Sequence, residues 1–90
     1  TMVKRVNVTV IDPVGLYATP ATELVDRMKA FNSDIKLVYA SKTVNMKSLM
    51  GVLSLGIPTK ANIEIIAEGE DEDAVIEKVT ELMKELNITK

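Results

Sequence analysis

Apolar and polar residues alternate along three segments of the chain, and a shorter segment follows the second of them. The alternation covers residues 6–10, 35–39 and 63–67, and a short return over 43–44 completes a hairpin with 35–39. A period of two is typical of a strand that buries one face, so the pattern predicts four strands. The residues expected on the buried faces of the three alternating strands are Val6, Val8, Val10, Ile35, Leu37, Tyr39, Ile63, Ile65 and Ala67.

Three further segments, over residues 21–28, 45–55 and 71–86, have the apolar spacing of a helix that buries one side. The second is apolar around much of its circumference, and Gly56 and Pro58 are expected to stop it. The apolar stripes of the other two helices consist of Leu24, Val25 and Met28 in the first and of Val75, Val79, Leu82 and Leu86 in the last.

Local rules also predict how the first and last helices begin. Thr19 is expected to be the N-cap of the first helix, with Pro20 as its first residue. Asp71 is expected to cap the last helix, where residues 70–73 place carboxylates at the positive end of the helix dipole. Lys84 then lies near the negative end. The acidic cluster can also be read as a metal site, but capping is the preferred interpretation in a chain without histidine, and no metal is assigned.

The predicted order is strand, helix, strand, strand, helix, strand, helix. Strands with one polar face and helices with one apolar side favour an α+β fold, an open-faced β-sandwich with three helices on one face of a four-stranded, mostly antiparallel sheet. The 90 residues show no repeat and no linker, so a single domain over residues 2–90 is expected. Thr1 precedes Met2 and is interpreted as a residue left over from expression.

Missing residue types narrow the chemistry. The chain has no cysteine and no histidine, which removes thiol chemistry, the commonest metal ligand and the commonest proton shuttle. The net charge is −2 and 3% of the residues are aromatic, so direct nucleic-acid binding is not expected. No apolar stretch approaches the ~20 residues of a membrane span, and the first residues lack a secretory pattern. A cytoplasmic protein without a cofactor or membrane insertion is expected.

Two segments carry motifs. Residues 15–21 are Gly-Leu-Tyr-Ala-Thr-Pro-Ala, and residues 45–55 are Asn-Met-Lys-Ser-Leu-Met-Gly-Val-Leu-Ser-Leu. They resemble two motifs of the HPr family, the small phosphocarrier proteins of the bacterial sugar phosphotransferase system. The first is similar to the family's G-[LI]-H-A-R-P-A at the start of its first helix, and the second matches the family's regulatory serine segment almost residue for residue. The element order also fits, so the resemblance covers essentially the whole chain.

The first motif differs from the family at two positions, Tyr17 and Thr19. The family's histidine takes a phosphoryl group from Enzyme I and passes it to sugar-specific transporters, and the neighbouring arginine helps to hold the phosphate. An imidazole is nucleophilic near neutral pH and forms a labile P–N bond, whereas a tyrosine hydroxyl is protonated there. Thr19 lacks the charged, planar fork that clamps a phosphate. The resemblance therefore implies a protein without catalytic residues, for which Enzyme I and the sugar permeases are not phosphotransfer partners.

The second motif contains Ser48, which is expected at or near the start of the second helix. In the family this serine is phosphorylated by the ATP-dependent HPr kinase/phosphorylase, and the phospho-form is corepressor for the catabolite control protein CcpA. The resemblance implies the same modification here, with a CcpA-type regulator of the LacI family as partner. A subgroup typified by Crh keeps the serine and lacks the histidine, and the sequence is most similar to that arrangement. The residues implied in the contact surface are Tyr17, Thr19, Lys47, Leu49, Met50 and Leu53.

Each of these residues also has a plainer interpretation. Ser48 alone would serve as an N-cap, the usual role of a serine at a helix start. Leu49, Met50 and Leu53 would belong to the core, and at least one of them is expected there. Tyr17 would cover an apolar surface with its hydroxyl in water, which we favour over a role as phosphate acceptor.

Three functions remain in view. The leading hypothesis is a non-enzymatic, Crh-like or HPr-like regulatory protein of carbon catabolite control. The alternative is the phosphocarrier protein HPr itself, with its active-site histidine and arginine replaced by Tyr17 and Thr19. The third is a binding module of the same fold that acts outside the sugar system.

Overall fold

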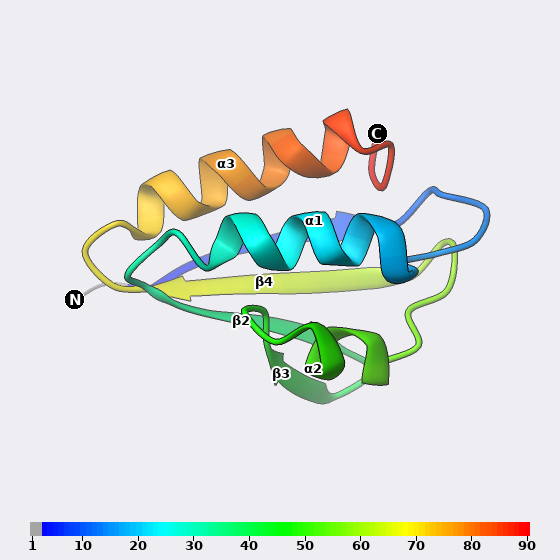
Figure 1. Cartoon of the computed structure of the whole chain (residues 1–90), viewed down its shortest axis with the longest axis horizontal. Helices are drawn as coiled ribbons and strands as arrows, with labels where there is room; N and C mark the ends of the chain where they lie inside the picture. Colours follow the sequence, from blue (N-terminus) through cyan, green and yellow to red (C-terminus); the bar gives the residue numbers. More distant parts are fainter. Residues whose placement is uncertain (1–2) are drawn as a thin grey trace.

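The computed structural model describes residues 3–90, so the interpretation of Thr1 lies outside the described residues. The elements follow the predicted order (Figure 1). They are β1 (Val3–Thr9), α1 (Ala18–Met28), β2 (Asp34–Tyr39), β3 (Lys42–Asn45), α2 (Leu49–Ser54), β4 (Asn62–Glu68) and α3 (Glu72–Glu85).

The four strands form one sheet in the order β1-β4-β2-β3, and every neighbouring pair is antiparallel. Ile65 lies opposite Val6 on one side and Leu37 on the other, which aligns the alternating apolar residues of three strands on one face. The three helices lie on that face (Figure 1). The predicted α+β open-faced sandwich is therefore confirmed.

The core lies between this sheet face and the helices. The predicted stripes of α1 and α3 are buried there, except that Leu86 is the C-cap of α3 and only partly buried. Met83 is fully buried although the spacing did not single it out. It lies next to Leu82 on the helix, so the buried side of α3 is wider than the predicted stripe.

The start of α1 differs from the prediction. Tyr17, not Thr19, is the N-cap, because the amide of Ala21 already donates to the Tyr17 carbonyl at 3.0 Å. Pro20 is therefore the third helical residue, where its missing N–H costs nothing since the first-turn amides have no intrahelical acceptor. The chain before Tyr17 is held by the buried Leu16, whose amide donates to the Ile57 carbonyl at 3.0 Å. This tertiary contact sets the helix start two residues before the local capping rule.

The second helix is also shorter than predicted. Asn45 is the last residue of β3 and lies opposite Lys36, and the amide of Met46 donates to the Ile35 carbonyl at 2.8 Å. Met46 is fully buried. Strand pairing thus continues to the residue just before Lys47, and α2 begins only at Leu49. The apolar pattern of residues 45–55 did not distinguish a buried strand end from a helix.

Candidate functional site

The two motif segments lie on a pair of helices that run in opposite directions (Figure 1). At one end, the bond from the Leu16 amide to the Ile57 carbonyl joins the start of α1 to the chain beyond α2. At the other end, the Lys47 ammonium donates to the Phe31 carbonyl at 2.7 Å, which joins the chain before α2 to the chain beyond α1. Tyr17 therefore lies near the end of α2, and Ser48 lies near the end of α1.

Ser48 is the N-cap of α2. Its backbone is extended, with φ −114° and ψ 113°, and its hydroxyl oxygen accepts a hydrogen bond from the Gly51 amide at 3.1 Å. The Ser48 amide donates to the Asn45 carbonyl at 3.0 Å, so the residue is held from both sides. The side chain is half-buried. A modified Ser48 oxygen would therefore remain at the start of the helix, beside its first amides.

The apolar residues after Ser48 divide between core and solvent. Met50 is 81% exposed, whereas Leu49 and Leu53 are partly buried and pack against the core. This division agrees with the expectation that part of the segment belongs to the core. Lys47 is also half-buried, and its ammonium is bonded within the chain. Met50 is the apolar side chain of this segment that α2 presents to solvent.

Tyr17 and Thr19 are both exposed at the start of α1, Tyr17 by 42%. No side chain caps this helix, and its first turn contains no acidic residue. The amides of Ala18 and Thr19 have no intrahelical acceptor because they belong to the first turn, and Pro20 has no amide hydrogen. An anion at this helix start would meet two backbone donors and no cationic clamp.

The loop before Tyr17 exposes two further apolar residues that lie outside both motifs. Val14 is 67% exposed and Ile11 is 47% exposed. Val14 lies at the corner of a turn in which its amide donates to the Asp12 carboxylate at 2.8 Å. The Asp-Pro-Val-Gly sequence of residues 12–15 could have predicted this exposure, because the central residues of a turn with this composition lie at the surface. With Tyr17, they make the chain at and just before the start of α1 apolar at its surface.

The acidic residues at the start of α3 lie where they were predicted, but the Asp71 side chain has a different partner. Asp71 is the N-cap by position, but its side chain makes no bond to α3. Its carboxylate accepts the amides of Asn32 at 2.8 Å and Ser33 at 2.9 Å, and also the Ser33 hydroxyl. These bonds, first of all that of the Ser33 hydroxyl, lower the pKa of Asp71 below its ordinary value of 3.8. Asp71 thus ties the α1–β2 loop to the β4–α3 loop.

The neighbouring carboxylates have separate partners. Glu72 accepts the Gly69 amide at 3.0 Å and so closes the first turn of α3 from inside the helix, while Asp73 pairs with Lys4 at 3.3 Å. Among residues 3–90 no group of three or more acidic side chains converges as a cation site would require. No helix in the same range is long and apolar enough to cross a membrane.

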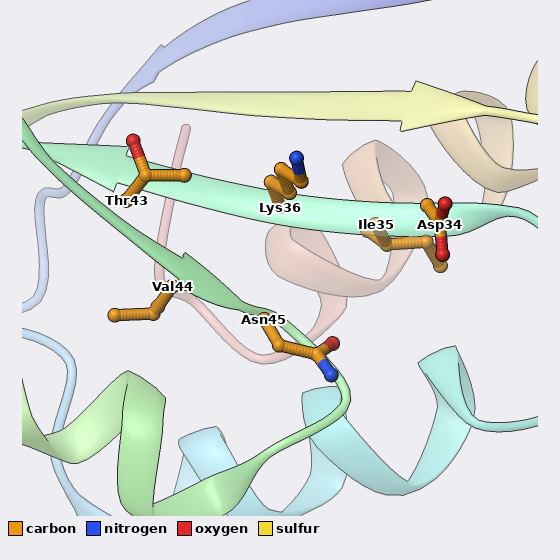
Figure 2. Close-up of a pocket in the computed structure, with 6 residues that line it drawn as sticks. All are labelled: Asp34, Ile35, Lys36, Thr43, Val44 and Asn45. Atoms are coloured by element: carbon orange, nitrogen blue, oxygen red, sulfur yellow. The ribbon is translucent and has the colours of Figure 1, made fainter.

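A pocket of about 360 Å³ is lined by residues of β2 and β3 (Figure 2). Its lining includes the Thr43 hydroxyl, the Lys36 ammonium and the Asp34 carboxylate, but the ion pairs of the described chain join none of them, so the pocket shows no activated nucleophile. Figure 2 shows its lining residues Asp34, Ile35, Lys36, Thr43, Val44 and Asn45.

Comparison with known proteins agrees with this arrangement. Residues 4–85 match the family model described as the PTS HPr component phosphorylation site. A histidine-containing phosphocarrier protein of Mycoplasma is 31% identical, with 97% of this chain and 99% of that one covered and a TM-score of 0.95. The phosphocarrier protein HPr of Bacillus anthracis is 35% identical, with 91% and 98% covered and a TM-score of 0.85. Crh of Bacillus subtilis is 40% identical, with 87% and 90% covered and a TM-score of 0.73.

The family model matches residues 4–85, which include the starts of both motif helices. The three relatives are 31%, 35% and 40% identical to this chain, which indicates a shared family and not only a shared fold. Members of this group are phosphocarrier proteins rather than enzymes, and their partners are proteins of sugar transport or its regulation. This chain therefore belongs to the HPr family, to which the sequences of its two motifs are similar.

Proposed function

We propose that this protein is a Crh-like regulatory member of the HPr family. HPr kinase/phosphorylase phosphorylates Ser48, and the phosphorylated form binds a CcpA-type regulator of the LacI family as corepressor. The protein does not carry phosphate on a histidine, because the chain contains none. The observation that carries the proposal is the hydroxyl of Ser48 at the N-cap of α2, two residues before a methionine that is 81% exposed.

The geometry of Ser48 supports a modification that changes the surface more than the fold. The Ser48 oxygen is an acceptor for the Gly51 amide, and its hydrogen is not needed for that bond. A phosphate ester keeps an acceptor at this position and adds negative charge at the positive end of the helix. The modified residue therefore retains its cap while the charge beside Met50 changes by about −2.

The surface that the regulator would contact is built from both motifs. Met50 supplies an adaptable apolar contact, and Leu49 and Leu53 form the partly buried base beneath it. Lys47 contributes by holding the start of α2 against the end of α1. Tyr17 and Thr19, exposed at the other end of the helix pair, would lie at the far edge of the contact.

The first test is the intact mass of the protein after incubation with HPr kinase/phosphorylase and ATP. We expect a gain of one phosphate in the native protein and none in Ser48→Ala. Ser54→Ala is the matched control, because Ser54 is an exposed serine on the same helix whose hydroxyl donates to the Gly51 carbonyl. Phosphate on Ser48→Ala, or no phosphate on the native protein, would reject the modification site.

The second test measures binding of the phosphorylated protein to the purified regulator. Met50→Asp is expected to weaken binding about tenfold without loss of stability, because the side chain is exposed and a central apolar contact is typically worth more than about 1 kcal/mol. If unphosphorylated protein bound the regulator equally well, Ser48 would not be a switch.

The second candidate function is phosphate carriage by an altered HPr. Two backbone amides without intrahelical acceptors at the start of α1 favour it, since they could still hold an anion. The absence of a nucleophilic imidazole and of a cationic clamp counts against it.

A further inference from the structure

A groove runs between the outer edge of β1 and the flank of α3, on a part of the molecule that neither motif reaches. Its volume is about 540 Å³. Val6 and Val8 form its base, with side chains that are only partly buried because β1 is the last strand of the sheet on this side. The remaining lining residues are Thr9, Ile11, Thr80, Lys84, Thr89 and Lys90.

The strand beside this groove has a row of backbone groups that point away from the sheet. The Val10 amide donates to the Ala61 carbonyl at 2.9 Å, and the Val10 carbonyl accepts the Lys60 amide at 2.7 Å, so Val10 faces β4. Residues that face the neighbouring strand alternate in an antiparallel ladder. Within residues 3–90 no strand pairs with the other edge of β1. The residues of β1 whose backbone groups point outward beside the groove are Arg5, Asn7 and Thr9.

The C-terminal segment already uses this edge at one point. The amide of Ile11, the next outward residue along the chain, donates to the Ile88 carbonyl at 2.7 Å. Ile88 is fully buried, so this contact is anchored by the core. The following residues, Thr89 and Lys90, line the groove rather than continuing the pairing along β1. This edge can therefore form main-chain hydrogen bonds, and within residues 3–90 no strand pairs with the part beside Val6 and Val8.

The charge of the groove selects among partners. Lys84 and Lys90 are its only charged lining residues in the described chain, and neither forms an ion pair there. A second copy that paired its β1 antiparallel about Val6 would bring its own Lys4 opposite Val8 together with Asp73, the ion-pair partner of Lys4. A second copy would therefore bring no net negative charge to these lysines. An acidic segment would have the opposite sign.

We propose that the outer edge of β1 binds an extended acidic segment of another protein as an added strand. The main chain of that segment bonds to Arg5, Asn7 and Thr9, its apolar side chains at alternate positions enter the groove over Val6 and Val8, and its carboxylates lie near Lys84 and Lys90. This surface is separate from Ser48, so the inference does not depend on the proposed phosphorylation.

Amide hydrogen exchange of the 15N-labelled chain tests the proposal. The probe is a blocked eight-residue peptide of alternating valine and threonine with two aspartates at one end, made in both sequence orders to allow either strand direction. We expect exchange of the Arg5, Asn7 and Thr9 amides to slow in proportion to the bound fraction. The amide of Thr43 points outward from the opposite edge strand, β3, and is expected not to change.

Two variants test the two sources of affinity. Asn7→Pro removes an outward donor but leaves the bonds to β4, and is expected to abolish the protection. Lys84→Glu is expected to weaken peptide binding about fivefold through lost attraction. Lys42→Glu makes the same charge change on the exposed edge strand β3 and is the control. Lys84→Glu leaves the backbone of β1 unaltered, so its effect on peptide binding tests the proposal even if Asn7→Pro does not fold.

Three results would overturn the proposal. The first is unchanged exchange of all three amides at millimolar peptide. The second is equal binding of a peptide with lysines in place of the aspartates. The third is protection that appears without peptide and rises with protein concentration, which would identify a second copy of the chain as the occupant.

Discussion

The two motif helices begin in physically different ways. At the start of α2, the Ser48 side chain accepts a hydrogen bond from the Gly51 amide, so the residue proposed to be modified is also the cap. At the start of α1, no side chain caps the helix, and the turn is held instead by the buried Leu16 and its bond to the Ile57 carbonyl. A helix start fixed by a side chain is sensitive to that residue, whereas one fixed by the packing of its preceding loop is not.

This difference explains why the fold can tolerate Tyr17 and Thr19 at the two positions where the resemblance implies the family's histidine and arginine. Both side chains are exposed, and neither contributes a capping bond to α1. Residue 17 supplies its backbone carbonyl to the first helical bond, and any residue type could do so. The chemistry of the first motif can therefore change without structural cost, while Ser48 combines a structural role with the proposed regulatory one.

The largest expected effect is the recovery of phosphotransfer at the start of α1. The double variant Tyr17→His, Thr19→Arg supplies an imidazole and a cationic phosphate clamp at the two positions that the resemblance implies. We expect it to accept one phosphate from phosphoenolpyruvate and Enzyme I, where the native chain accepts none, as measured by intact mass. Tyr17→Phe with Thr19→Arg is the control. No transfer in the histidine variant would mean that the surface for Enzyme I differs as well.

The next effect concerns the loop that holds α1. Gly15 has φ +86°, and a Cβ there would clash with the Ile57 carbonyl oxygen and lie 2.9 Å from the Pro58 carbonyl carbon. Gly15→Ala is expected to lower the free energy of unfolding by about 2–4 kcal/mol in urea. Gly56→Ala is a matched control, because Gly56 has φ +57° but open space around it, and should cost about 1 kcal/mol. Equal losses would show that backbone conformation, not the contact with Ile57, sets the cost.

Removing the cap of α2 should have a smaller effect. Ser48→Ala leaves the Gly51 amide without its acceptor and is expected to cost about 1 kcal/mol of unfolding free energy. Ser48→Asp keeps an acceptor and is expected to remain within a few tenths of a kcal/mol of the native chain. If both variants lost the same stability in thermal unfolding, the cap would not be the reason.

Adding a side-chain cap to α1 should raise the unfolding free energy by less than removing the cap of α2 lowers it. Tyr17→Ser would place a side-chain acceptor at a position with the extended backbone of an N-cap. Pro20 offers no amide hydrogen at the third helical position, so only the Thr19 amide remains as donor. We expect a gain of at most about 0.5 kcal/mol in the unfolding free energy. A gain equal to the Ser48→Ala loss would contradict the proposed role of Pro20.

The smallest expected effect is a loss of stability in acid, where Asp71 becomes protonated. The bonds from Ser33 and Asn32 lower the pKa of Asp71 in the folded state below its ordinary 3.8. The carboxylate therefore adds stability above about pH 4, and this contribution is lost as the pH falls through the lowered folded pKa. Native protein should lose more stability than Asp71→Asn between pH 5 and pH 2.5 in urea unfolding, while both helix starts are unaffected. Parallel losses in the two proteins would exclude this linkage.

The residues that sequence reasoning placed correctly are those whose role depends on near neighbours. The alternation around Ile35, Leu37 and Ile65 and the stripes on α1 and α3 report the two faces of each element, and the structure confirms them. Ser48 at the start of α2 was predicted from its own segment, and its N-cap geometry agrees. In each case the deciding contact lies within the element or arises from simple burial of one face.

The features that local patterns did not predict depend on partners far along the chain. Met46 continues strand pairing because Ile35 offers a carbonyl, and Tyr17 begins α1 because the loop before it is fixed on Ile57. Asp71 is the N-cap of α3 as predicted, but its side chain bonds to Asn32 and Ser33, 39 and 38 positions away. Local capping rules cannot predict such contacts, because a distant amide competes with the nearby one only once the chain has folded.

By itself the sequence determined the order of the elements, the core face of each one, the family resemblance and the absence of an imidazole. These follow from residue identity and short-range periodicity. The tertiary structure decided that Tyr17 and Ser48 lie at opposite ends of the α1–α2 pair and that Met50 is exposed while Leu49 and Leu53 are partly buried. It also decided that no strand among residues 3–90 pairs with the outer edge of β1. These properties depend on which segments pack together, and they arise because burial and backbone bonding are satisfied over the whole molecule rather than within one segment.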